Sequence, residues 1–162
     1  MTKSTPSPQL RLETEADTTR LATAFARHMC AGDVLLLNGG LAAGKTFFVS
    51  AAVAALGAPD AVSSPTYTLA NIYASPKGPV VHMDAYRLKS PADFADLALE
   101  DEFARGLAFI EWGAMLAGEF DDYVSLELAQ EPAEEQARLA TLTSEGPRGA
   151  ELLAHVLKDF TT

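Results

Sequence analysis

One glycine-rich segment of the chain carries the residue types that bind phosphate groups. The segment is Gly39-Gly40-Leu41-Ala42-Ala43-Gly44-Lys45-Thr46, which matches the pattern G-x-x-x-x-G-K-[ST]. In this pattern the glycines let backbone N–H groups converge on an anion. The lysine brings a positive charge to the β- and γ-phosphates, and the hydroxyl is placed to ligate Mg²⁺. A glycine-rich turn with a chance lysine would match as well, so the flanking segments have to decide.

The segments on either side of this turn are those that a phosphate-binding loop requires. Residues 33–38 (DVLLLN) form a short continuous apolar run, which predicts a strand buried on both faces. Residues 45–56 are expected to form a helix, closed by Gly57, whose positive N-terminal end would point at the anion. The context therefore favours a phosphate-binding loop over a plain turn.

Two acids follow further apolar runs that we expect to be buried strands. Asp84 comes after Val80-Val81-His82-Met83, and Glu111 comes after Leu107-Ala108-Phe109-Ile110. Acids at strand ends beside a phosphate-binding loop are where Mg²⁺ and an attacking water are usually controlled. Either acid could instead cap its strand or pair with an arginine such as Arg87.

Two other sites are open to more than one interpretation. Ser64-Pro65-Thr66 lies in the loop after the phosphate-binding helix, where it is either a γ-phosphate sensor or a plain turn. His82 alternates with the presumed core positions, which favours a structural histidine over a ligand. No Cys/His cluster with zinc-ligand spacing occurs in the sequence.

The remaining pattern predicts an α/β fold, a three-layer P-loop NTPase-like domain with a mixed central sheet. Thr14 is the expected N-cap of a helix ending at Gly32, with Asp17 completing a capping pair. Ser90 and Pro91 begin another helix. The other expected elements are an edge strand at 9–13, hairpins at 67–74 with 79–84 and at 123–129 with 136–143, a strand at 107–112 and a helix at 148–160.

Composition limits the classes of partner. The net charge of −10 and the pI near 4.6 oppose direct, tight binding to nucleic acid, which needs clustered Lys and Arg. No apolar run approaches the roughly 20 residues that a membrane-spanning helix needs, and no secretory signal is evident. Cys30 is the only cysteine and is expected to be a packed thiol in a helix. A cytoplasmic location with no membrane partner is the simplest expectation.

Several segments together resemble the TsaE (YjeE) family, the bacterial ATPases of tRNA threonylcarbamoyladenosine biosynthesis. The segments are the phosphate-binding run, Ser64-Pro65-Thr66-Tyr67-Thr68-Leu69, His82-Met83-Asp84-Ala85-Tyr86-Arg87-Leu88 and Ile110-Glu111-Trp112, in the family's order and spacing. The resemblance runs from about residue 15 to at least residue 112. The polar, Pro/Ser-rich residues 1–8 are expected to form a disordered tail, followed by a single P-loop ATPase domain at residues 9–162.

The resemblance also implies roles for individual residues. Lys45 would hold the phosphates of ATP, Thr46 and Glu111 would ligate Mg²⁺, and Asp84 would be an essential acid near the γ-phosphate. The remaining nucleotide-binding positions would be the rest of the loop from Gly39 to Phe47, together with Thr18, Thr66 and Trp112. The implied function is ATP hydrolysis that resets an assembly of TsaD and TsaB as it modifies adenosine 37 of tRNA. The chain would then meet tRNA only indirectly, through that complex.

The sequence departs from the family's usual run, Asp-Leu-Gly-Ala-Gly-Lys-Thr-Thr, at three positions. Gly40 replaces the aspartate, Ala42 the first glycine and Phe47 the second threonine. The first change removes a negative charge next to bound phosphate, and Ala42 stiffens the loop. These departures bear on the hydrolysis rate and the nucleotide preference more than on binding.

Two alternative functions fit the same motif. A small-molecule kinase would need an arginine-rich lid, and the stretch after Gly113 offers only Arg138 and Arg148. A nucleotide-gated interaction module with little catalysis is compatible with the altered loop. No obvious arginine finger is present, so we expect slow turnover by the chain alone. The motif does not distinguish ATP from GTP, because there is no N-K-x-D segment.

Overall fold

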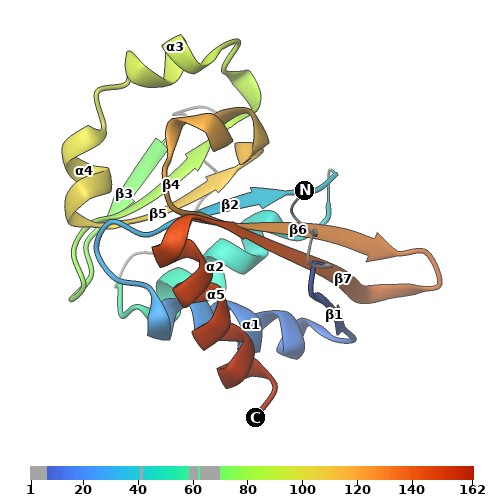
Figure 1. The fold of residues 1–162 in the computed structure, drawn as a ribbon. Helices are drawn as coiled ribbons and strands as arrows, with labels where there is room; N and C mark the ends of the chain where they lie inside the picture. Colours follow the sequence, from blue (N-terminus) through green and yellow to red (C-terminus); the bar gives the residue numbers. More distant parts are fainter. Residues whose placement is uncertain (1–6, 41, 59–61, 63–69) are drawn as a thin grey trace, which may run out of the picture.

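The computed structural model describes residues 7–40, 42–58, 62 and 70–162, and its strands form one seven-stranded sheet (Figure 1). The sheet order is β1-β7-β6-β2-β5-β4-β3. β2 pairs in parallel with β5 and β6, and β4 with β5, whereas the other neighbouring pairs are antiparallel. The sheet is therefore mixed, as predicted. The strands are β1 Gln9–Leu12, β2 Val34–Asn38, β3 Ala70–Tyr73, β4 Val80–Asp84, β5 Leu107–Glu111, β6 Tyr123–Glu131 and β7 Glu134–Glu145.

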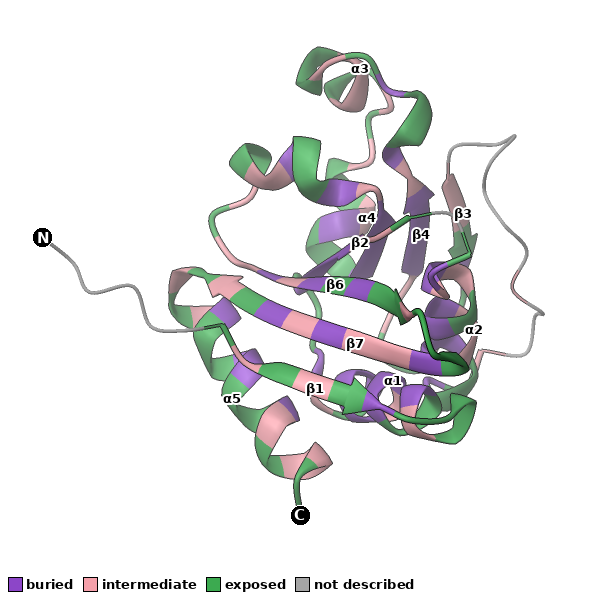
Figure 2. Cartoon of the chain, turned by 90° about the vertical axis from the view of Figure 1, so that its right-hand side faces the viewer, coloured by how far each residue is buried: buried purple, intermediate pink, exposed green. Residues whose placement is uncertain are grey.

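Helices cover the sheet on two sides, which gives the predicted three layers (Figures 1 and 2). α1 (Glu15–His28), α2 (Lys45–Ala55) and α5 (Gly146–Phe160) cover one face. The short helices α3 (Pro91–Ala95) and α4 (Glu100–Arg105), with 3₁₀ turns at Ala85–Arg87 and Gly113–Glu119, cover the other. Neither α4 nor either 3₁₀ turn was predicted from the sequence. Each is short, so each gives little periodic signal.

Strand β2 is buried on both faces, as its apolar run predicts. Leu35 and Leu37 pack into the cluster under α1, α2 and α5, whereas Val34 and Leu36 pack into the cluster on the opposite face. β7 lies nearer the edge of the sheet and instead buries only Ala137, Ala140 and Leu142, with more exposed residues between them and at both ends (Figure 2). The end of β2 that leads into the phosphate-binding loop is thus held from both sides.

Helix α1 begins as predicted but ends earlier. The Thr14 side chain accepts the N–H of Asp17 at 3.3 Å, and the Asp17 carboxylate accepts the N–H of Glu13 at 3.1 Å. The helix stops at His28, well before Gly32, and the Lys77 ammonium donates to three carbonyls at this end, at 2.8–2.9 Å. Cys30 therefore lies outside the helix and is exposed, so the prediction of a packed thiol was wrong.

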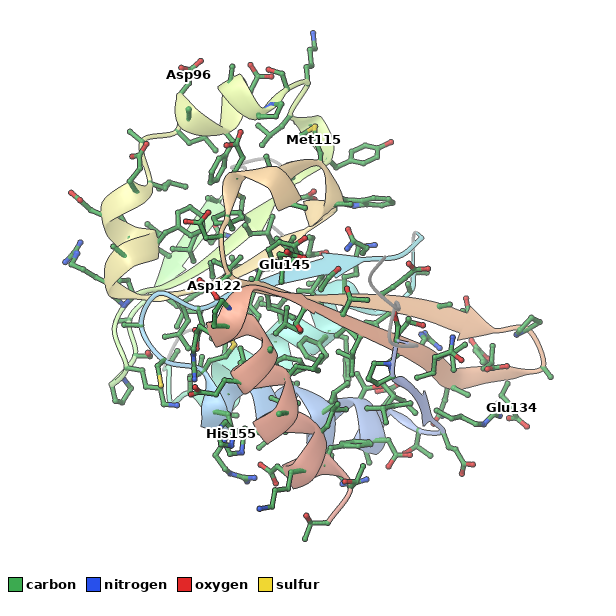
Figure 3. The ribbon with its side chains drawn as sticks, viewed as in Figure 1. Asp96, Met115, Asp122, Glu134, Glu145 and His155 are labelled. Atoms are coloured by element: carbon green, nitrogen blue, oxygen red, sulfur yellow. The ribbon has the colours of Figure 1, made fainter. Side chains whose placement is uncertain are left out.

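The predicted β6–β7 hairpin is present and longer than expected. Glu134 lies at its far end, while Asp122 and Glu145 lie together at its base (Figure 3). There Asp122 Oδ1 accepts the backbone N–H of Arg148 at 2.8 Å and so caps the start of α5. None of the helices among the described residues has the length and hydrophobicity that a membrane crossing requires.

Some predictions fall on residues that the structure does not describe. Most of the tail at residues 1–8 is among them, so its disorder and the division of the chain into a tail and one domain stay predictions. The expected strand at 67–74 is described only as β3, Ala70–Tyr73.

Candidate functional site

The carboxyl ends of three parallel strands meet beside the glycine-rich loop. Asp84 at the end of β4 lies opposite Glu111 at the end of β5, and Glu111 lies opposite Leu37 of β2. The loop leaves β2 directly after Asn38 and enters α2 at Lys45. Ligands of open α/β sheets bind outside the carboxyl ends of the strands, which is where these residues gather.

The backbone of the loop needs glycine at two of its predicted positions. Gly39 has φ +146°, and a Cβ there would lie 2.4 Å from the carbonyl oxygen of Leu128. Gly44 has φ +102° and is the N-cap of α2. At Gly40 a Cβ would meet nothing within 4 Å, so the loop backbone leaves room for a side chain to begin there.

A third position of the loop has a left-handed backbone although it is not a glycine. Ala42 adopts φ +63°, a left-handed conformation that favours the glycine of the family's usual run. Leu41 lies outside the described residues. The loop therefore holds one alanine in a conformation that costs free energy.

The Lys45 side chain points back into the loop. Its ammonium donates to the carbonyls of Gly39 and Gly40 at 2.8 and 2.9 Å, and it lies 4.1 Å from the centre of the Trp112 ring. Burial lowers the pKa of Lys45, and the neighbouring Glu111 and Asp84 carboxylates oppose that shift. An anion that displaced the two carbonyls could bind this buried ammonium in their place.

A chain of hydrogen bonds joins α2, β5 and β4 next to Lys45. The Thr46 hydroxyl lies 3.1 and 3.0 Å from the two carboxylate oxygens of Glu111, which is 4% exposed. His82 Nε2 lies 2.5 Å from Glu111 Oε2, and His82 is fully buried. The histidine therefore contacts a predicted site residue. Its place two residues before Asp84, on the same face of the strand, was the available signal.

Asp84 and Trp112 line the same edge. Asp84 Oδ1 accepts the backbone N–H of Tyr86 at 2.9 Å, so this acid caps the turn that follows its strand. Capping at the strand end was one of the alternatives that the sequence left open for it. Trp112 has φ +58°, and its backbone N–H donates to the Leu37 carbonyl at 2.7 Å. Its ring contacts the Tyr86 ring, with centroids 5.1 Å apart. Strained non-glycine backbone of this kind is often found at functional sites.

A pocket of about 340 Å³ opens on the other side of the loop. Thr18 of α1, 4% exposed, and Phe47 of α2, 40% exposed, both line it. The structure thus brings these two predicted residues to the loop. Thr66 lies outside the described residues, as does the rest of the proposed sensor segment.

Arg138 of β7 reaches the loop from the far end of the sequence. Its guanidinium donates to the carbonyls of Ala43 at 2.8 Å and Ala42 at 3.3 Å. It also donates to the carbonyl of Glu135 at 2.6 Å. This contact was not predicted from the sequence, because no local pattern links Arg138 with Ala43, which lies 95 positions earlier.

The oxygen ligands beside Lys45 suit a hard cation that takes its remaining ligands from phosphate and water. No group of three or more His, Cys, Asp or Glu residues that could hold a metal occurs in the described part of the chain. Thr46 and Glu111 offer one hydroxyl and one carboxylate. Mg²⁺ in phosphate-transfer sites takes few protein ligands and completes its shell with phosphate oxygens and water, so these residues fit that ion.

Comparisons with known proteins agree with the resemblance seen in the sequence. Residues 12–139 match the family described as "Threonylcarbamoyl adenosine biosynthesis protein TsaE". A Treponema pallidum protein named "tRNA threonylcarbamoyladenosine biosynthesis protein TsaE" is 42% identical over 108 residues, 66% of this chain and 79% of its own length. A Bacillus subtilis protein of the same name is 34% identical over 130 residues, 80% and 78% of the two chains.

A solved structure shares the fold. The crystal structure of Bacillus subtilis YdiB superposes with a TM-score of 0.74 at 26% identity, covering 96% of this chain and 98% of that one. The family match spans well over half of the chain and includes the loop, both acids and Trp112. The chain belongs to the TsaE family.

Proposed function

We propose that this chain binds Mg·ATP and hydrolyses it to ADP and phosphate, as a subunit in the formation of N6-threonylcarbamoyladenosine at position 37 of tRNA. The observation that carries the proposal is the Lys45 ammonium inside a glycine loop, next to the Thr46–Glu111 pair. The names of the relatives tie them to the same tRNA modification, which supports the biological setting.

In the proposed complex the phosphates replace the loop carbonyls as partners of Lys45. Backbone N–H groups of the loop and the N-terminus of α2 add positive potential at the same place. Thr46 and Glu111 would hold Mg²⁺, whose chemistry is to neutralise charge on the phosphate oxygens. Trp112 packs against the Lys45 ammonium and limits its contact with water.

Hydrolysis would rest on positioning. Asp84 has one carboxylate oxygen fixed by the Tyr86 N–H, so the group is oriented and could align a water molecule and accept its proton. His82, on the neighbouring strand β4, contacts the Glu111 carboxylate and holds it in place. The Arg138 guanidinium is bound to loop carbonyls, so slow turnover is expected without a partner.

The proposed partners are TsaD and TsaB, with tRNA reached only through them, in the cytoplasm. The net charge of −10 supports this arrangement, because an acidic chain is repelled by a phosphate backbone. ATP hydrolysis would reset the TsaD and TsaB assembly between turnovers.

The test combines nucleotide titration with phosphate release, alone and with TsaD and TsaB. Lys45→Ala should abolish ATP binding, because no other ammonium replaces it in the loop. Asp84→Ala should keep ADP affinity within about threefold and lose hydrolysis. Lys158→Ala and Asp96→Ala are exposed controls on α5 and at the end of α3, and both should behave as wild type. Unchanged ATP affinity in Lys45→Ala would contradict the proposal.

The alternative of a nucleotide-gated module with little hydrolysis has one observation in its favour. Ala42 holds a left-handed conformation in the loop, and position 40 lacks the family's acid. Partner binding that follows ATP, with no phosphate released even when TsaD and TsaB are present, would identify such a switch. The kinase alternative finds less support, since Arg148 is paired with Asp33 and Glu151 and Arg138 with loop carbonyls.

A further inference from the structure

Phe47 presents an aromatic ring that the fold does not use. Among the described residues only four large apolar side chains are exposed, and Phe47 is one of them at 40%. Its neighbour Phe48 is fully buried and packs edge-on against Phe25, with ring centroids 5.8 Å apart. Phe48 thus packs in the core, while Phe47 lies at the surface beside the loop.

The exposed ring lines the pocket that opens off the phosphate-binding loop. Three elements form this pocket of about 340 Å³: α1, the loop with the start of α2, and β7. Gly44, which directly precedes Lys45, is part of its wall. Lys45, Thr46 and Glu111 are not, so the pocket is a separate space next to the phosphate site. A ligand with its phosphates at Lys45 could extend into it past Gly44.

The charges of the pocket decide which part of a nucleotide it accepts. Glu15 and Glu135 place two carboxylates in the wall, and the Arg138 guanidinium there is bound to backbone carbonyls. Carboxylates repel phosphate but accept hydrogen bonds from amino groups. Thr18 and Gln136 add a hydroxyl and an amide. The lining therefore suits a neutral, planar base with an exocyclic amine.

We propose that Phe47 stacks on the purine base of the bound nucleotide and gives the site its base preference. The inference rests on the proposed function, since it concerns the same nucleotide. Every base has a π-face, but a purine covers more of a ring than a pyrimidine does, so stacking favours ATP over CTP. Position 47 departs from the threonine of the family's usual run, so the stacking ring is a feature of this sequence.

The test compares three ligands by calorimetric titration in Mg²⁺: ATP, CTP and inorganic tripolyphosphate. The wild-type chain should bind ATP about tenfold more tightly than CTP or tripolyphosphate. Phe47→Leu should lose that advantage and keep its affinity for tripolyphosphate within about twofold, because Leu is apolar but has no ring. Phe47→Tyr should retain the preference for ATP. Ile72→Ala, which removes another exposed apolar side chain on the edge strand β3, is the control.

Two outcomes separate this inference from the proposed function, and a third tests both at once. If Lys45→Ala abolishes ATP binding but Phe47→Leu binds ATP as tightly as wild type, the stacking role is overturned and the function stands. A loss of affinity in Phe47→Leu that is equal for ATP and tripolyphosphate also overturns it, because the ring would then support the loop and not the base. If the wild-type chain binds none of the three ligands, both proposals fail together.

Discussion

His82 and Glu111 form a buried pair between two neighbouring parallel strands. His82 Nε2 of β4 lies 2.5 Å from Glu111 Oε2 of β5, and the same carboxylate contacts the Thr46 hydroxyl of α2. The other ring nitrogen, Nδ1, has no hydrogen-bond partner among the described residues. The histidine thus fixes the carboxylate from the sheet side while Thr46 contacts it from the helix side.

Replacing His82 should therefore disturb the site more than the core. His82→Phe removes one of the two side chains that contact the buried Glu111 carboxylate and leaves it only the Thr46 hydroxyl. The change should cost about 1–3 kcal/mol of unfolding free energy, measured in urea. ATP hydrolysis should fall at least about tenfold, with a smaller change in ADP affinity, because Glu111 loses its orientation. His82→Gln, which keeps an N–H donor, should recover part of the activity.

The control for this change is Met83→Leu, a nearly volume-conserving swap one residue along the strand and on the opposite face. It should cost less stability and leave hydrolysis unchanged. Full hydrolysis in His82→Phe would show that Glu111 needs no partner on β4.

The left-handed conformation of Ala42 predicts a stabilising substitution. A Cβ at φ +63° is strained, and glycine relieves that strain although it adds freedom to the unfolded chain. Ala42→Gly should raise the unfolding free energy by roughly 1 kcal/mol. Ala54→Gly, on the exposed side of α2, should lower it by up to about 1 kcal/mol. Equal destabilisation by both changes would argue against strain at residue 42.

Arg138 predicts a long-range effect on nucleotide binding. Its guanidinium donates to two consecutive loop carbonyls and so fixes the orientation of the peptide groups at that point of the loop. Arg138→Ala should weaken ATP and tripolyphosphate binding alike, by about tenfold, since hydrogen bonds to charged groups are the strong ones. Arg11→Ala removes an arginine that pairs with Glu131 in the same hairpin region and should leave binding unchanged. An effect on ATP alone would assign Arg138 to the base pocket.

Local signals explain why much of the site could be predicted. The loop, its preceding strand and its helix form one continuous segment, and each part has its own pattern: glycine spacing, an apolar run and a helix start. Asp84 and Glu111 could be placed because parallel strands end at the same edge. One crossover connection joins the two parallel strands that end in these acids, so the topology alone brings the acids together.

Contacts between distant segments could not be predicted in this way. Arg138 meets Ala43 only because β7 and β6 return beside β2, and strand order is not encoded in periodicity. The early end of α1 depends on Lys77, which lies in the turn between β3 and β4 and reaches the helix only after folding. The exposure of Cys30 follows from that end.

The contact between α1 and α5 carries a prediction about acid stability. Asp159 of α5 accepts hydrogen bonds from Arg27 and, at 3.0 Å, from His28 Nε2, both near the end of α1. The Arg27 hydrogen bond is the main reason that the pKa of Asp159 lies below its usual range, and His28 adds to the effect. A carboxylate whose pKa is lowered by folding stabilises the native state above its unfolded pKa, and that contribution is lost as the pH falls through the folded value.

Asp159→Asn should accordingly lower the unfolding free energy near pH 7, and the difference from wild type should shrink below about pH 4 as the native carboxylate is protonated. The difference shrinks in acid because, as the pH falls, the unfolded chain takes up the proton at a higher pH than the native chain does. Acid therefore removes from the wild type a stabilisation that Asp159→Asn lacks at every pH. Urea unfolding at a series of pH values measures it. Asp96→Asn removes an exposed carboxylate at the end of α3, far from His155 and α5 (Figure 3), and its difference from wild type should stay flat. A gap between wild type and Asp159→Asn that persists unchanged in acid would mean that the contact stabilises by packing and not by charge.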